Sequence, residues 1–177
     1  MKLAPRALPE LLAGRRIASV TGTNGKTTTT HFLTAAVRAE TPDGQRSVVT
    51  NADGANLHHG IVSALGQAPD ATIAVLETDE RVVADVVAMG SPEVLVLLNF
   101  SRDQLDRNHE LTFLGRDWRA ALEKAAEHGP TVVANACDPL IVWVCQKARH
   151  VIWVDTKPRW TADATLCPCL LYTSPSP

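Results

Sequence analysis

Residues 20–29, Val-Thr-Gly-Thr-Asn-Gly-Lys-Thr-Thr-Thr, combine the residue types that bind phosphate. Gly22 and Gly25 lack a Cβ, so the backbone can turn tightly and bring its N–H groups against an anion. Lys26 can reach the outer phosphates of a nucleotide, and the Thr27 hydroxyl can ligate magnesium. The pattern predicts a nucleotide-binding loop formed by Gly22, Thr23, Asn24, Gly25, Lys26, Thr27 and Thr28.

The spacing of this loop is not the common one. The usual pattern, G-x-x-x-x-G-K-S/T, places a Gly at position 20, where this chain has Val20. An ordinary Gly/Asn turn between a strand and a helix is the alternative interpretation. The context favours the loop, because the apolar run 17–20 predicts a buried strand and the residues after Lys26 predict a helix to about Ala39.

Glu77 directly follows an apolar run, residues 72–76, that predicts another buried strand. A carboxylate at the end of such a strand can hold the magnesium ion that bridges the phosphates. The alternative is an acid that complements a helix dipole, which suits Asp79 and Glu80 better. We therefore expect Glu77 to be a magnesium ligand together with Thr27, and a catalytic residue together with Lys26.

Apolar runs alternate with helical segments along the rest of the chain. Further strands are expected at 47–50, 94–98, 131–134 and 151–154, and helices at 9–13, 57–65, 80–89, 113–127 and from 138 onward. The alternation predicts an α/β fold, a doubly wound, mostly parallel sheet of the P-loop type with helices on both faces. Ligands of such sheets bind beyond the carboxyl ends of the strands, where Asn99 and Asn135 are also expected.

The bulk properties exclude several classes of protein. A chain of 177 residues with 45% hydrophobic residues is long enough for one domain with a real core. A net charge of −2 gives no reason to expect a nucleic acid partner. No apolar run approaches the roughly 18 residues of a transmembrane segment, and no signal peptide is apparent, so a cytoplasmic location is expected.

The loop at 22–28 and the run Asn-Phe-Ser-Arg-Asp-Gln-Leu-Asp-Arg at 99–107 resemble the Mur ligase family, the ATP-dependent amide-forming enzymes of peptidoglycan synthesis. Many members have His where this chain has Gln104. The form with Gln is similar to the MurT branch, the synthetase subunits of lipid II isoglutaminyl synthase. The runs 51–60 and Asn135-x-x-Asp138-Pro139 add to this resemblance, which covers about residues 10–168.

The resemblance implies ATP and magnesium as cofactors, with Asn135 on the side of the nucleotide base. For the intact protein it implies phosphorylation of the D-glutamate α-carboxylate of lipid II, followed by attack of ammonia to give D-isoglutamine. A GatD-like glutaminase partner would supply the ammonia. The alternatives are another Mur ligase that adds an amino acid to a UDP-MurNAc peptide, and a non-catalytic ATP-binding scaffold.

MurT-type proteins usually carry a four-cysteine zinc ribbon that begins Cys-Pro-x-Cys, and Cys167-Pro168 matches its start. Cys167 is therefore expected to be a zinc ligand in the intact parent. Cys169 comes one position too early, and residues 169–177 resemble translated library-adapter DNA. We expect residues 1–168 to be an incomplete central ATP-binding domain, inactive alone, and residues 169–177 to be a non-native tail.

Overall fold

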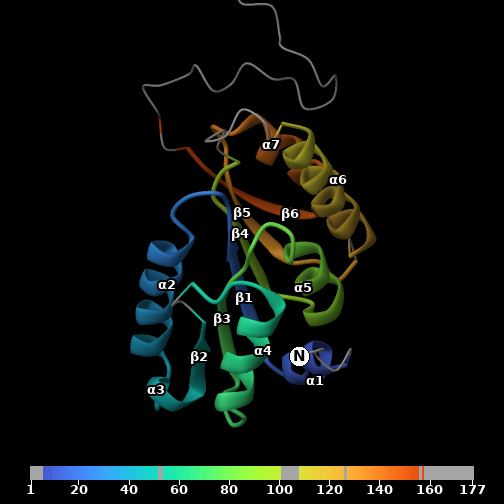
Figure 1. Ribbon diagram of the computed structural model, residues 1–177. Coiled ribbons are helices and arrows are strands. Elements are labelled where there is room, and N and C mark those ends of the chain that lie inside the picture. Colours follow the sequence, from blue (N-terminus) through green and yellow to red (C-terminus); the bar gives the residue numbers. More distant parts are fainter. Residues whose placement is uncertain (1–5, 52–53, 101–107, 126, 156, 158–177) are drawn as a thin grey trace, which may run out of the picture.

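The computed structural model describes residues 6–51, 54–100, 108–125, 127–155 and 157. Within them, parallel strands form one six-stranded sheet in the order β2-β3-β1-β4-β5-β6 (Figure 1). In chain order the strands are β1 Arg16–Thr21, β2 Val48–Thr50, β3 Ile73–Glu77, β4 Val94–Leu97, β5 Thr131–Asn135 and β6 His150–Val154. Every pairing is parallel, which confirms the predicted sheet.

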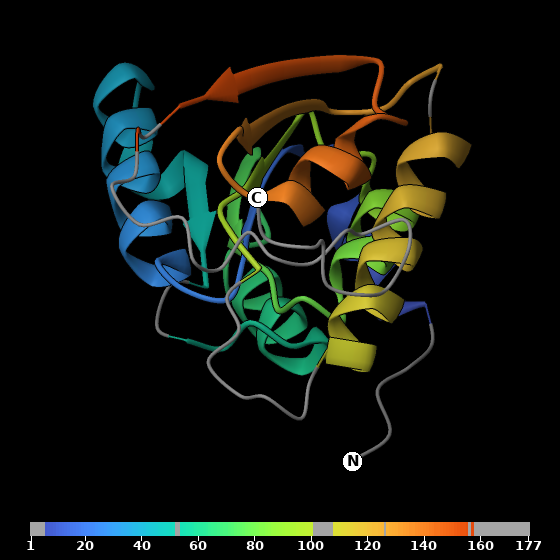
Figure 2. The ribbon, with the colours of Figure 1, turned by 90° about the horizontal axis from the view of Figure 1, so that it is seen from above.

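Helices cover the sheet on both faces, as predicted. Helix α2 lies on one face, and the helices that follow β2, β3, β4 and β5 lie mainly on the other (Figure 2). The helices are α1 Ala7–Leu12, α2 Lys26–Glu40, α3 Gly44–Ser47, α4 His58–Gln67, α5 Val83–Gly90, α6 Asn108–Lys124 and α7 Pro139–Cys145. Helix α7 starts as its sequence predicts, because the Asp138 carboxylate accepts hydrogen bonds from the N–H groups of Leu140 and Ile141.

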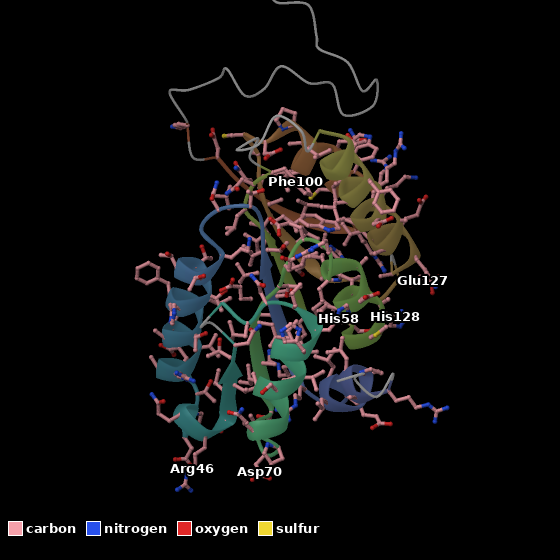
Figure 3. All side chains as sticks on the ribbon, in the orientation of Figure 1. Arg46, His58, Asp70, Phe100, Glu127 and His128 are labelled. Atoms are coloured by element: carbon pink, nitrogen blue, oxygen red, sulfur yellow. The ribbon has the colours of Figure 1, made fainter. Side chains whose placement is uncertain are left out.

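Two apolar clusters fill the space between the sheet and this second layer of helices. One joins β4 and β5 to α5, α6 and α7, and the other joins β1 and β3 to α1, α4 and α5. Trp118 of α6 is 1% exposed and packs against Phe100, with ring centroids 4.4 Å apart. Figure 3 shows Phe100 between the end of β4 and α6. Cys145 is 2% exposed in the first of these clusters, and burial raises the pKa of its thiol to about 12.

The largest differences from the sequence-based expectation are at two helices. Helix α6 begins at Asn108, five positions before the predicted start at Phe113. Helix α3 is not predicted by the sequence, which assigns its last residue, Ser47, to the strand expected at 47–50. It forms because Gly44 packs directly on α2, where an added Cβ would lie 2.2 Å from the carbonyl oxygen of Arg38.

Strand β6 is an edge of the sheet, and Ile152, Trp153 and Val154 are exposed along it. Within the described ranges, no helix has the length and apolar character needed to cross a membrane. Several predictions lie outside the described residues: the run at 101–107 with Gln104, the proposed zinc ligand Cys167 and the tail at 169–177.

Candidate functional site: a phosphate-binding loop beside a buried carboxylate

The loop between β1 and α2 depends on two glycines. Gly25 has a φ of 85°, a left-handed conformation that favours glycine, and it directly precedes the first residue of α2. A Cβ on Gly22 would lie 2.8 Å from the Cβ of Leu98 and 2.9 Å from the backbone nitrogen of Asn99. The close approach of the loop to the end of β4 therefore requires a glycine at position 22.

The unusual spacing has a structural explanation. Val20, at the position of the first Gly in the common motif, is still part of β1 and is fully buried between β3 and β4. The turn therefore begins only after Thr21. The loop is shorter than the common form, but it still leads directly into the N-terminus of a helix, where N–H groups favour anions.

Asn99 holds the loop in place from the neighbouring strand end. Its side-chain oxygen accepts a hydrogen bond from the Asn24 N–H at 2.9 Å, and its side-chain amide donates to the Asn24 carbonyl at 3.0 Å. The Asn99 carbonyl also accepts a hydrogen bond from the Thr23 N–H at 2.9 Å. The sequence predicts that Asn99 lies at this edge of the sheet but does not reveal that it fixes the loop.

Lys26 extends its ammonium group over the loop. Its Nζ donates to the carbonyl oxygens of Gly22 at 2.5 Å and Thr23 at 3.2 Å, and it pairs with Glu80 Oε1 at 3.4 Å. An ammonium group has three N–H donors, and the two carbonyls fix its position. The contact with Glu80 is the longest, so it is the one that a phosphate oxygen would most easily replace.

Glu77 ends β3, directly beside β1, and its Cα partner in the register is Val20. The side chain is 2% exposed. Oε1 accepts a hydrogen bond from the Asn56 amide at 2.9 Å, while Oε2 is buried with no hydrogen-bond partner among the described residues. A buried carboxylate oxygen without a donor is unfavourable unless a cation or another donor can reach it.

The sequence alone predicts no role for the residues that position Glu77. The Asn51 side chain bonds to both backbone groups of Glu77, accepting from its N–H and donating to its carbonyl oxygen at 2.8 Å each. Next to it, the hydroxyl groups of Ser19 and Thr78 bond to each other at 2.7 Å inside the core. Asn51 is a polar residue at a strand end, which is the signal that could have identified it.

The carboxylates near the loop are partly neutralised by cations. Burial raises the pKa of the Asp79 carboxyl, but hydrogen bonds and charge from Arg81, helped by the charge of Lys26, outweigh this and leave the pKa below its usual range. The Arg81 Nε donates to Asp79 at 2.8 Å. Asp79 is therefore already paired with Arg81, while Glu77 keeps one oxygen without a partner among the described residues.

Asn135 lies at the end of β5, on the same edge of the sheet. Its side chain donates to the Leu98 carbonyl at 2.9 Å and accepts from the Cys137 N–H at 2.9 Å. Asp138 accepts a hydrogen bond from the Phe100 N–H at 2.6 Å. These contacts tie the turn before α7 to the end of β4, so Asn135 helps to shape the edge on which a nucleotide would lie.

The residues present fit magnesium and phosphate. The Thr27 side chain is exposed at the start of α2, and at the end of the neighbouring strand β3 Glu77 offers an oxygen that has no partner in the described part of the chain. Across the described ranges, no group of three or more His, Cys, Asp or Glu residues could hold a metal ion by itself. Magnesium usually binds through one or two protein ligands together with phosphate oxygens and water, which matches this arrangement.

The match to a known family agrees with this geometry. Residues 20–159 match the model of the Mur ligase middle domain. The chain therefore belongs to the Mur ligase family, whose members are ATP-dependent ligases that form carbon–nitrogen bonds.

Two relatives are MurT subunits of a glutamine-hydrolysing lipid II isoglutaminyl synthase. The chain is 40% identical over 137 residues to the lipid II isoglutaminyl synthase subunit MurT of Streptococcus pneumoniae, covering 75% of this chain and 29% of that protein. It is 33% identical over 127 residues to the MurT subunit of Staphylococcus aureus, covering 71% of this chain and 28% of that protein. This chain thus spans less than a third of the length of these relatives.

A solved structure supports the fold. The UDP-N-acetylmuramoyl-L-alanyl-D-glutamate–2,6-diaminopimelate ligase superposes with a TM-score of 0.57 at 21% identity, covering 87% of this chain and 34% of that chain. At this level of identity the likeness supports the α/β architecture of a Mur ligase central domain.

Proposed function

We propose that this chain is the ATP-binding part of a MurT-type ligase. One observation carries the proposal: the register of β1 and β3 places the loop that bears Lys26 next to Glu77, whose buried Oε2 has no partner within the described residues. In this role the backbone of residues 22–28 binds the phosphates, and Lys26 neutralises their charge. Thr27 and Glu77 hold magnesium, and Asn135 lies on the base side of the nucleotide.

The proposed reaction of the intact protein has two steps. A carboxylate oxygen of the D-glutamate in lipid II attacks the γ-phosphorus of ATP, so the bond to ADP breaks and an acyl phosphate forms. The nitrogen of ammonia then attacks the acyl carbon, inorganic phosphate leaves, and D-isoglutamine is the product. Such chemistry needs positioning and charge neutralisation more than a protein nucleophile.

The glutaminase partner and the zinc site are proposed from the resemblance to MurT subunits. A GatD-like glutaminase supplies the ammonia, and lipid II supplies the acceptor. Cys167 serves as a zinc ligand only in a longer parent protein. An assay of that parent protein can compare ammonia and amino acids as nucleophiles. Amide formation with ammonia alone supports the MurT assignment. Ligation of an amino acid supports another Mur ligase.

Nucleotide titration of the 177-residue chain tests the loop. Lys26→Ala removes a charge-assisted phosphate contact and is expected to weaken magnesium–ATP binding by about ten- to a hundredfold, which calorimetry can measure. Lys124→Ala, on the exposed side of α6, is the matched control and should leave affinity unchanged. Equal affinities of Lys26→Ala and the wild type would disprove the loop assignment.

Turnover of the full-length parent tests Glu77. Glu77→Gln keeps the shape of the side chain but removes the charge that holds magnesium. We expect it to reduce turnover more than ATP binding, because the metal neutralises charge that develops during phosphoryl transfer. Near-normal turnover at limiting magnesium would assign Glu77 a purely structural role.

A further inference from the structure

A hollow of about 630 Å³ lies beside α2, where this helix faces α3 and β2. Figure 1 shows these three elements side by side at one edge of the sheet. The hollow is lined from α2 by residues one turn and more beyond the phosphate-binding loop. We call it the α2 hollow and define it by its polar lining residues: His31, Thr34, Arg38, Gln45 and Thr50.

Arg38 brings a positive charge to the α2 hollow. Its Nη2 donates to the carbonyl oxygen of Val48 at 3.2 Å, which holds the guanidinium between α2 and β2. Its Nε is buried and has no hydrogen-bond partner in the described part of the chain. A guanidinium group has donors only, so an acceptor oxygen is required to satisfy this N–H.

Two hydroxyl groups in the α2 hollow are also unsatisfied. Thr34 is 3% exposed, and the Oγ1 atoms of Thr34 and Thr50 are buried without a partner in the described ranges. Thr21 and Thr30 also have such hydroxyls, but they do not line the hollow. Unpaired buried polar groups are uncommon in folded proteins, and here three of them, within the described ranges, belong to side chains that line the same hollow.

The charge of the lining determines what could bind. The described residues that line the α2 hollow include no Asp or Glu. Gln45 adds an amide, and His31 adds an imidazole at the end nearer the loop. A ligand that satisfies this lining must therefore bring acceptor oxygens and negative charge.

We propose that the α2 hollow binds a small anion through a carboxylate or phosphate group. Arg38 Nε donates to one oxygen of that group, and the hydroxyls of Thr34 and Thr50 donate to the same group. The site is separate from the phosphate-binding loop, because none of residues 22–28 lines it. The inference therefore does not depend on the proposed ligase activity.

Amide shifts in NMR spectra of the ¹⁵N-labelled 177-residue chain test the proposal, with succinate and inorganic phosphate as separate probes at constant ionic strength. The phosphate titration is performed on Lys26→Ala, so that binding at the loop does not interfere. Saturable shifts confined to the second half of α2 and to β2 are expected with at least one probe. A response to succinate alone identifies a carboxylate site, and a response to phosphate alone identifies a phosphate site.

Substitutions distinguish specific binding in the α2 hollow from non-specific attraction of the anion to surface charge. Arg38→Gln and Thr34→Val are each expected to weaken binding by about tenfold or more. Arg46→Gln removes the same charge from the exposed end of α3, where the side chain projects away from the sheet (Figure 3), and should leave binding unchanged. Circular dichroism checks folding, and Thr34→Val keeps the test valid if Arg38→Gln unfolds.

The proposal is overturned if neither probe gives saturable shifts, or if the shifts lie at residues 22–28. It is also overturned if Arg38→Gln and Thr34→Val, both folded, bind as tightly as the wild type. Equal weakening by Arg38→Gln and Arg46→Gln would likewise overturn it, because that result indicates non-specific attraction to positive charge.

Discussion

Two regions of this molecule bury polar side chains, and they treat these side chains in opposite ways. At the ends of β1 and β3, the buried groups of Asn51, Ser19 and Thr78 are bonded to one another or to the strand backbone. In the α2 hollow, Thr34 and Thr50 keep buried hydroxyls with no partner among the described residues. The first arrangement fixes backbone geometry, and the second leaves hydrogen-bonding capacity for something that binds.

Glu77 combines the two arrangements within one residue. Its backbone is bonded to Asn51 and its Oε1 to Asn56, while Oε2 has no partner in the described ranges. At this edge of the sheet we therefore distinguish supporting groups, whose hydrogen bonds hold the backbone, from binding groups, which keep hydrogen-bonding capacity for a ligand. Substitution of a supporting group should cost stability, and substitution of a binding group should cost ligand affinity.

The largest loss of stability is expected for Asn51→Ala. The substitution leaves the buried N–H and carbonyl groups of Glu77 without partners, so the free energy of unfolding should fall by about 2–4 kcal/mol. Urea denaturation measures it. Asn56→Ala removes only one partly buried bond and should cost about 1 kcal/mol. Similar losses for the two variants would contradict the supporting role of Asn51.

Two buried threonines provide a direct comparison. Thr78→Val leaves the Ser19 hydroxyl unpaired in the core and should lower the free energy of unfolding by about 2 kcal/mol. Thr34→Val removes a hydroxyl that has no partner in the described structure, so the change should stay within about 0.5 kcal/mol or be stabilising. The same denaturation assay measures both variants. A large loss for Thr34→Val would indicate that its hydroxyl supports the fold.

Magnesium binding is expected to change the free energy of unfolding by a smaller amount. At about ten times its dissociation constant, magnesium should raise the free energy of unfolding of the wild type by about 1.4 kcal/mol. Glu77→Gln should lose this increase, because the unpaired Oε2 no longer carries charge. Thermal unfolding with and without the ion measures the difference. Glu93→Gln serves as the control, since Glu93 lies at the opposite end of the sheet's strands, before β4.

The smallest effect is expected for an exposed pair. Arg16 hydrogen bonds to Glu93, and this bond together with its charge lowers the pKa of the Glu93 carboxyl. The resulting stability is present above the ordinary pKa of Glu and is lost as the pH falls through the lowered value. Glu93→Gln should therefore be slightly less stable than the wild type at neutral pH, and equal to it in strong acid. A difference that persists in acid would contradict an electrostatic origin.

Much of the fold could be predicted from the sequence because its signals are local. Apolar runs of four or five residues identify the strands, and Asp138-Pro139 marks the start of a helix. The two loop glycines, with Lys26 between strand and helix, predict the tight turn that leads into α2. Such local signals do not predict the order of the strands in the sheet, because that order depends on contacts between distant segments.

The supporting residues of the site could not be predicted for the same reason. Asn51 bonds to a residue 26 positions away, and Ser19 bonds to one 59 positions away. Ser19 carries no local signal, and the polar character of Asn51 at a strand end does not reveal the distant residue to which it bonds. The α2 hollow was equally hidden, because it depends on Gly44 allowing α3 to pack against α2. Threonines in a helix give no indication that their hydroxyls lack partners.

Trp118 gives the molecule its own optical signal. Its indole N–H donates to the Glu80 carbonyl at 2.8 Å, and the Glu80 side chain pairs with Lys26. The buried Trp118 is thus linked to Lys26 of the loop through Glu80, while Trp153 is exposed at the far edge of the sheet. Fluorescence from the buried indole lies at shorter wavelength than fluorescence from Trp153. A phosphate that displaces Glu80 from Lys26 would therefore alter the blue side of the emission spectrum, without any dye or label.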